Sequence, residues 1–207
     1  MGIFHSRIAF SALALPLSWC NAAMGRIVAA FLSIVLLSGG CSDRVNTWVG
    51  EQGGLVADSR QARVDSAAGP LLRQCGGKHI EIRVLDNDAV TAYGWRGGSL
   101  FLTRRLVDLM DDNELAATIA HELGHLLDDG HVRSMTSLRG CEQEHNLDLE
   151  SRADLIGAEL LRNAHISPTA MAGMLRKVQD QGRLAVGCRQ AVSRRIELLV
   201  ARLPSDQ

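Results

Sequence analysis

The most informative stretch of this sequence places two histidines and a glutamate within five residues. His121, Glu122 and His125 form the pattern His-Glu-x-x-His. If the stretch is helical, residues four apart lie above one another on one face, so His121 and His125 can direct imidazole nitrogens at one metal ion. Glu122 lies beside the first ligand, where its carboxylate can take a proton from a water on that metal. The pattern therefore predicts a zinc hydrolase centre with two histidine ligands and a glutamate general base.

The residues around the motif predict that it lies on a buried helix. The flanking positions, such as Ile119 and Leu123, are apolar, and Asp111 followed by Glu114 resembles a capping box. The same five-residue motif could occur on an amphipathic surface helix with two solvated histidines. Such a helix would not need apolar residues on both sides of the motif. We expect the helix to run over about residues 112–128.

A catalytic zinc takes three protein ligands and leaves one position for water. His131 lies six residues after His125, but Asp128 stands where that ligand arrangement requires a glycine. Glu150 is the other candidate, and Asp154 lies one turn later on the same helix face. A glutamate at a helix start is also favoured by the helix dipole alone. After a His-Glu-x-x-His motif, we favour Glu150 as the third ligand of one zinc ion per chain.

Hydrophobic periodicity predicts the elements that position these residues. Strict alternation predicts a strand over 80–84, and a turn at Gly97-Gly98 joins two further strands over 89–95 and 99–103. Helical spacing is expected over residues 58–72, 104–110, 147–163, 168–181 and 190–203. The fold class is therefore α+β, a helix-rich domain with a small three-stranded sheet beside the metal-binding helix.

The first forty residues predict an export signal. One arginine and an apolar run over 27–37 precede small residues and Cys41, which resembles a bacterial lipoprotein signal in which the cysteine becomes lipidated. A second apolar run over 8–19 precedes Met24, and we expect translation to start at Met24. The alternative is an uncleaved membrane anchor, although each run is shorter than the ~20 residues that span a bilayer.

The chain then divides into a signal over residues 1–40, a lipidated N-terminus and tether over 41–57, and one domain over 58–207. A net charge of −1 without a basic stripe predicts no nucleic-acid partner. Beyond Cys41 the sequence holds three cysteines, and an odd number in an oxidising compartment predicts one disulfide and one free thiol.

Over about residues 58–200 the chain resembles the HtpX-like zinc metallopeptidases, a family that includes the CAAX prenyl endopeptidases. The stretches that carry the resemblance are Thr91-Ala92-Tyr93, the strand over 98–103, Asn113 to Ala116 before the motif, and Glu150 to Gly157 as Glu-x-x-Ala-Asp-x-x-Gly. It is most similar to the small periplasmic members from Gram-negative bacteria. The resemblance implies a zincin-like gluzincin fold with Glu150 as ligand and Asp154 as a carboxylate that orients a ligand histidine or assists proton transfer.

One position departs from the family pattern. Arg189-Gln190 stands where the family has His-Pro, and Cys188 lies beside it. The resemblance places this segment and the loop of Cys141 near the cleft, so we expect a Cys141–Cys188 disulfide that leaves Cys75 free. The alternatives are that Cys188 is a small buried residue, or that its thiolate occupies the open zinc position.

Together these features predict a zinc endopeptidase that degrades misfolded or misassembled outer-membrane and periplasmic proteins. We expect it to be lipid-anchored in the outer membrane, facing the periplasm, with extended substrates pairing along the strand near Ala92 to Trp95. Tyr93 and Trp95 are expected either to line that cleft or to pack in the core. Alternative functions are a non-catalytic zinc-containing assembly factor or chaperone-like lipoprotein, and a zinc amidase that acts on a non-protein substrate.

Overall fold

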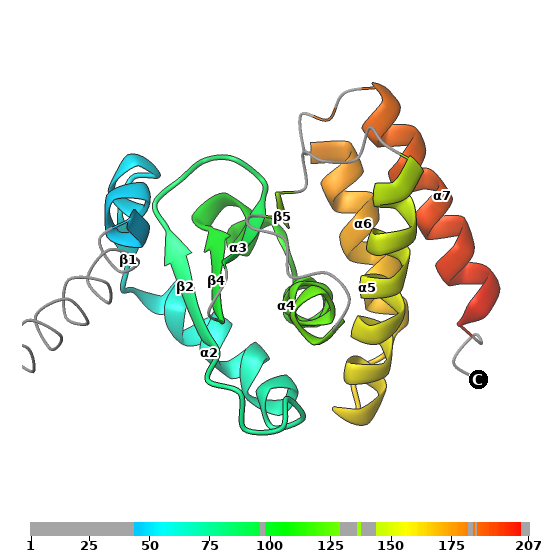
Figure 1. Cartoon of the computed structure of the whole chain (residues 1–207), viewed down its shortest axis with the longest axis horizontal. Helices are drawn as coiled ribbons and strands as arrows, with labels where there is room; N and C mark the ends of the chain where they lie inside the picture. Colours follow the sequence, from blue (N-terminus) through cyan, green and yellow to red (C-terminus); the bar gives the residue numbers. More distant parts are fainter. Residues whose placement is uncertain are drawn as a thin grey trace, which may run out of the picture. The chain divides into compact units, whose positions relative to one another are not determined.

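The helix that carries the metal motif lies between a small sheet and the C-terminal helices of a computed structural model (Figure 1). The structure describes residues 44–95, 98–128, 136–137, 144–181, 184 and 186–203, and of these only the backbone at 136–137 and 144–146. The chain divides into two units, Met1–Thr47 and Trp48–Gln207, and the second contains the motif. In the described residues every helix is too short or too polar to cross a bilayer.

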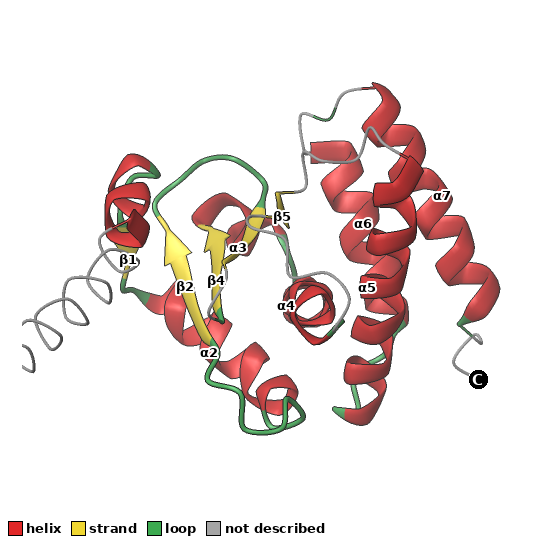
Figure 2. Ribbon diagram, in the orientation of Figure 1, coloured by secondary structure: helices red, strands yellow, loops and turns green. Residues whose placement is uncertain are grey.

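The sheet is mixed and has the strand order β1-β2-β4-β3-β5 (Figure 2). The central strand β4 (Ser99–Thr103) pairs in parallel with β2 (Glu81–Leu85) and antiparallel with β3 (Ala92–Trp95). These are the three predicted strands. The expectation of a three-stranded sheet was nevertheless incomplete, because the edge strands β1 (Leu55–Val56) and β5 (Thr136–Ser137) are two residues long and too short to show a period.

One face of this sheet forms the main core together with the helices. Val84 of β2 and Leu100 and Leu102 of β4 are fully buried in that core. They pack with residues of α2 (Ser59–Leu72) and α4 (Asp112–Leu127), among them Val64 and Ile119. Helix α3 (Arg104–Leu109) connects β4 to α4, so the sheet and α2 together fix one side of the motif helix.

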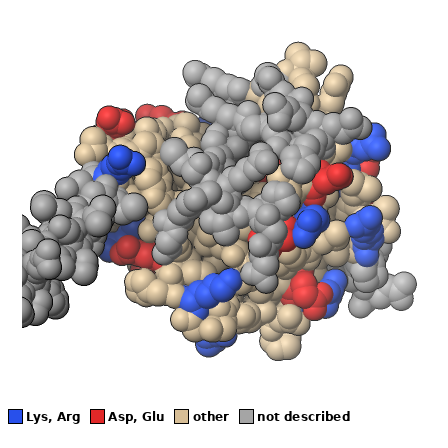
Figure 3. Space-filling model, viewed as in Figure 1, with Lys and Arg blue, Asp and Glu red and all other residues tan. Residues whose placement is uncertain are grey.

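On its other side, α4 packs against α5 (Glu144–Asn163) and α6 (Thr169–Gln181), and α7 (Val186–Arg202) packs on these two helices (Figure 1). Helix α7 begins four residues before its predicted start at 190, so Cys188 lies on the helix and not in the loop before it. On the face in Figure 3, acidic and basic side chains of the described residues are interspersed.

The segment before the predicted domain is more ordered than a tether. Residues 44–51 are helical, and Leu55 and Val56 pair with Leu85 and Val84 of β2. The range 41–57, predicted as a lipidated N-terminus and tether, thus contains regular secondary structure at residues 44–51 and 55–56. A helix of two turns is too short to produce a clear hydrophobic period.

Helices α4 and α5 are in backbone contact at two glycines. A Cβ atom on Gly124 would lie 2.5 Å from the carbonyl oxygen of Ala153, and one on Gly157 would lie 3.0 Å from the backbone of Ala120. The contact at Gly124 is closer than Cβ atoms approach, so a side chain there would push the helices apart, and at Gly157 the Ala120 backbone would have to shift slightly. This close approach is what carries Glu150 of α5 over to the histidines of α4.

We therefore expect Gly124→Ala to destabilise the fold by about 1–3 kcal/mol, the usual cost of overpacking a core. The free energy of unfolding in urea and the zinc affinity measure the effect. Gly187→Ala is the matched control, because a Cβ atom on Gly187 of α7 meets nothing within 4 Å. Equal free energies of unfolding of the two variants would show that the close α4–α5 contact does not determine the stability of the fold.

Candidate metal centre

Helix α4 begins where its capping box predicts and presents the motif to the interior. The Asp111 carboxylate accepts a hydrogen bond from Glu114 N–H at 2.9 Å, and the Glu114 carboxylate accepts one from Asp111 N–H at 2.9 Å. The predicted capping box is therefore confirmed. From Glu114 to Gly124 all residues of α4 are buried, because the sheet covers one side of the helix and α5 and α6 cover the other.

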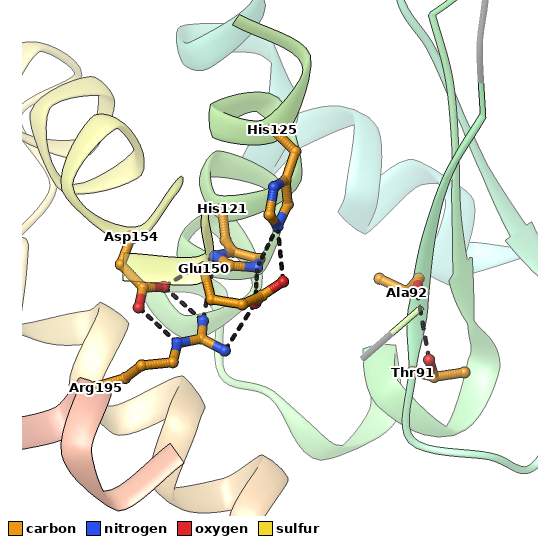
Figure 4. Close-up of polar contacts among 7 residues, drawn as sticks. All are labelled: Thr91, Ala92, His121, His125, Glu150, Asp154 and Arg195. Atoms are coloured by element: carbon orange, nitrogen blue, oxygen red, sulfur yellow. Dashed lines mark hydrogen bonds and ion pairs between the residues drawn. The ribbon is translucent and has the colours of Figure 1, made fainter. Parts of the chain in front are cut away.

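Three side chains from two helices meet at one point (Figure 4). His121 Nε2 lies 3.2 Å from His125 Nε2. Glu150 Oε2 lies 3.3 Å from His121 Nε2, and Glu150 Oε1 lies 3.3 Å from His125 Nε2. Ligands about 2.0–2.1 Å from a tetrahedral zinc are ~3.3 Å apart, which is the separation found here. The donor set of two imidazoles and one carboxylate is also that of a catalytic zinc.

Asp154 contacts Nδ1 of His121 at 2.9 Å, and a carboxylate there accepts the Nδ1–H. In the neutral ring that a metal requires, this contact would leave the lone pair on Nε2, which faces the other ligand groups. Asp154 is 1% exposed and lies one helical turn after Glu150. The contact therefore agrees with the orienting role that the family resemblance implies for this carboxylate.

Arg195 completes the centre, and sequence reasoning assigned it no role. This α7 residue is 3% exposed and donates through two nitrogens to both Asp154 oxygens, each at 2.7 Å (Figure 4). A third nitrogen lies 2.8 Å from Glu150 Oε2. The sequence did hold a signal for this role: Arg195 lies on the same helix face as the apolar residues Val192 and Leu199, which predicts that it is buried. A buried guanidinium needs acidic partners.

The ionisation of these groups follows from burial and from their neighbours. Burial alone would raise the pKa of Asp154, but the Arg195 guanidinium outweighs it and lowers that pKa to about 2. The pKa of Glu150 is held well below its usual value for the same reason. For His121, burial opposes the charged form, yet the hydrogen bonds to Asp154 and Glu150 raise its pKa to about 10.

Glu122 is next to the ligand group and is not one of its members. It is 3% exposed, and its Oε2 atom has no hydrogen-bond partner among the described residues. Burial raises the pKa of this carboxyl, while His121 and His125 lower it. A buried carboxylate oxygen without a protein partner requires a water or a substrate proton, as a general base would.

The alternative third ligand, His131, lies outside the described residues. Asp128 stands where a His131 ligand arrangement requires a glycine. Its carboxylate accepts a hydrogen bond from Arg152 of α5 at 2.6 Å. It therefore joins the end of α4 to α5. Within the part of the chain that the structure describes, Glu150 is the residue that converges with the two histidines and could hold a metal with them.

Of the cysteines, Cys188 is disulfide-bonded and Cys75 is free and buried. A bonded sulfur cannot ligate zinc as a thiolate, so the hypothesis that Cys188 blocks the zinc position is wrong. Cys141, its expected partner, and Cys41 both lie outside the described residues. The Cys141–Cys188 pairing therefore stays a prediction.

The strand expected to receive substrate is only partly free. One edge of β3 pairs with β4, and the other edge pairs with β5 at Tyr93 and Gly94. The side chains of Tyr93 and Trp95 contact Trp48. They pack in an apolar cluster, and the cleft-lining alternative is not needed to explain them.

A model of peptidase family M48 matches residues 58–147. Over this segment the chain is similar to peptidase family M48. The resemblance to HtpX-like metallopeptidases is thus confirmed at the level of the family. The matched segment contains the His-Glu-x-x-His motif and ends before Glu150, so the M48 match and the geometry of α5 and α7 support the centre independently. No curated protein matches the chain.

We expect Glu150→Ala to lose zinc and His131→Ala to retain it. The Glu150 carboxylate is one of three converging ligand groups, and two histidines alone bind zinc weakly. Metal content per chain after dialysis measures the difference, with circular dichroism to show that both variants are folded. The opposite pattern would make His131 the third ligand.

We also expect zinc binding to release a proton at pH 7. The pKa of His121 is raised to about 10 in the metal-free protein, so its imidazole is protonated, whereas zinc requires the neutral ring. Titration calorimetry in buffers of different ionisation enthalpy counts the protons released. Asp154→Asn should release fewer, because it removes the carboxylate that raises this pKa. Without zinc, the protonated His121 stabilises the fold fully below its unfolded pKa of about 6.5. That contribution is lost as the pH rises through about 10.

Proposed function

We propose that this M48-family chain is a zinc endopeptidase of the cell envelope that hydrolyses misfolded or misassembled outer-membrane and periplasmic proteins. The observation that carries the proposal is Glu122, a buried carboxylate with an unpartnered oxygen beside a complete set of zinc ligands. A zinc site with only a structural role has four protein ligands and no need of a base. This favours an enzyme over a zinc-containing assembly factor.

Zinc bound by His121, His125 and Glu150 would acidify a water and polarise the carbonyl of the scissile peptide bond. Glu122 then accepts a proton from the water as its oxygen bonds to the carbonyl carbon. The same carboxyl passes the proton to the leaving nitrogen as the carbon–nitrogen bond breaks. The water oxygen thus ends in the new carboxyl group, and the proton ends on the new amine.

The surrounding residues hold this arrangement in place. Asp154 keeps His121 in the tautomer that presents Nε2, and Arg195 holds both Asp154 and Glu150. Because these groups are buried and paired, their positions are set before a substrate arrives. Removing Arg195 would leave two acidic side chains without their counter-charge, which is costly in a buried site.

The cell location is part of the same proposal. A lipoprotein-type signal ends at Cys41, and the first described residue, Arg44, lies three positions later in a helix. We infer that a lipid on Cys41 anchors the chain in the outer membrane, facing the periplasm. Unfolded segments of envelope proteins would then reach the centre as extended chains, which suit pairing with a strand edge.

Glu122→Gln is expected to keep zinc and to lose about 10²–10⁴-fold in the rate of casein cleavage, because it removes the base and no ligand. Glu159→Gln on the exposed face of α5 is the matched control and should behave as wild type. Metal content and proteolysis are measured on the same samples. Casein cleavage by the Glu122 variant at the wild-type rate would refute the mechanism. An active centre that cleaves peptidoglycan amides but not casein would favour an amidase.

A further inference from the structure

All the Phe, Tyr and Trp residues after position 43 gather in one cluster. The Trp48 ring contacts Tyr93, Trp95 and Phe101, with ring centroids 5.1, 5.5 and 5.3 Å apart. Trp48 is the first residue of the unit that contains the metal centre. The cluster therefore joins the start of this unit to β3 and β4.

This cluster lies on the sheet face opposite the main core. Tyr93 of β3 and Phe101 of β4 are register partners, whereas Leu100 and Leu102, on either side of Phe101, belong to the core. Phe101 and Leu85 are both buried, yet neither is part of the contiguous core around α4. Trp48, Leu85, Tyr93, Trp95 and Phe101 thus form a second apolar layer, which we call the outer-face cluster.

The rim of the outer-face cluster is amphipathic and carries paired charges. Trp48, Tyr93 and Trp95 are partly exposed, and Leu55 on the neighbouring strand β1 is 50% exposed. Arg83 on the same face donates to Glu81 at 2.8 Å. Partly exposed Trp and Tyr rings are typical of surfaces at the membrane–water interface.

The length of chain between Cys41 and Trp48 limits the distance between a lipid on Cys41 and the outer-face cluster. Trp48 lies seven positions after Cys41, and an extended chain of that length spans at most about 25 Å. A unit the size of Trp48–Gln207 is roughly 40 Å across. A lipid on Cys41 would therefore keep Trp48 within about 25 Å of the bilayer, which is less than the width of the unit.

We propose that the outer-face cluster docks on the headgroup layer of the phospholipid bilayer in which Cys41 is anchored. The inference rests on the lipid attachment proposed above. Docking by this face places the sheet between the membrane and α4, since α4 packs on the other face of the sheet. The metal centre, which α4 shares with α5, then lies on the side of the sheet away from the lipid.

The test uses the two tryptophans as reporters. Full-length lipidated protein is reconstituted in phosphatidylethanolamine–phosphatidylglycerol vesicles that carry a spin label near the headgroup or at the acyl-chain end. Trp48→Phe and Trp95→Phe each leave one reporter after residue 43. We expect both to show blue-shifted emission and to be quenched more strongly by the headgroup-proximal label.

A matched pair of surface variants separates docking from attachment. Leu55→Glu, on the cluster rim, should lose the quenching while the protein still floats with the vesicles. Val200→Glu on α7, at a residue that is 59% exposed, should keep the quenching. Cys41→Ala should lose both vesicle attachment and quenching, and all three variants should keep zinc.

The outcomes distinguish this inference from the proposed function. Vesicle-bound protein with unquenched tryptophans overturns docking and leaves lipid anchoring intact. Blue-shifted but unquenched emission together with a dimeric mass also overturns it, because a second copy then covers this face. Unchanged vesicle attachment after Cys41→Ala overturns lipid anchoring itself. None of these results bears on casein cleavage, which depends on Glu122.

Discussion

Charge balance in a buried site is the constraint on which this structure depends. Glu122, Glu150 and Asp154 bring three carboxylates together, and Arg195 brings one guanidinium, so the formal charge is −3 + 1 = −2 when the histidines are neutral. A divalent zinc ion would bring this sum to zero. Without the metal, a proton on His121 supplies part of the missing charge, because its hydrogen bonds to Asp154 and Glu150 raise the pKa of the imidazole, whereas the pKa of Glu122 is raised mainly by burial. The same net charge of −2 favours zinc binding. Without Arg195 the net charge of the site would be −3.

These charges meet because three helices are brought together by different kinds of contact. Gly124 and Gly157 let the α4 and α5 backbones touch, which sets Glu150 against the histidines. Helix α7 packs on α5 and α6 and is also tied by the disulfide of Cys188. The ion pairs of Arg195 then span α7 and α5, so the centre depends on the position of a helix that supplies no metal ligand.

The two faces of the sheet pack against different parts of the chain. One face holds α2 and α4 in the main core, and the other packs its aromatic residues against Trp48 near the proposed anchor. A sheet covered on both faces is rigid, which suits a centre whose ligands need fixed positions. Strand β3 takes part in both layers, because Ala92 faces the main core and Tyr93 faces the outer cluster.

The sequence alone determined the features that repeat over short distances. The spacing of His121 and His125, the capping box at Asp111 and the strand over Ser99–Thr103 are local patterns with periods of 3.6 or 2 residues, so they could be predicted. The two-residue strands β1 and β5, the helical turns from residue 44 and the early start of α7 were missed, because such short segments form through contacts with distant residues. Only the tertiary structure decided that Arg195, forty-one residues beyond Asp154, closes the metal centre, since a buried ion pair depends on which helices pack together and leaves no period in the chain.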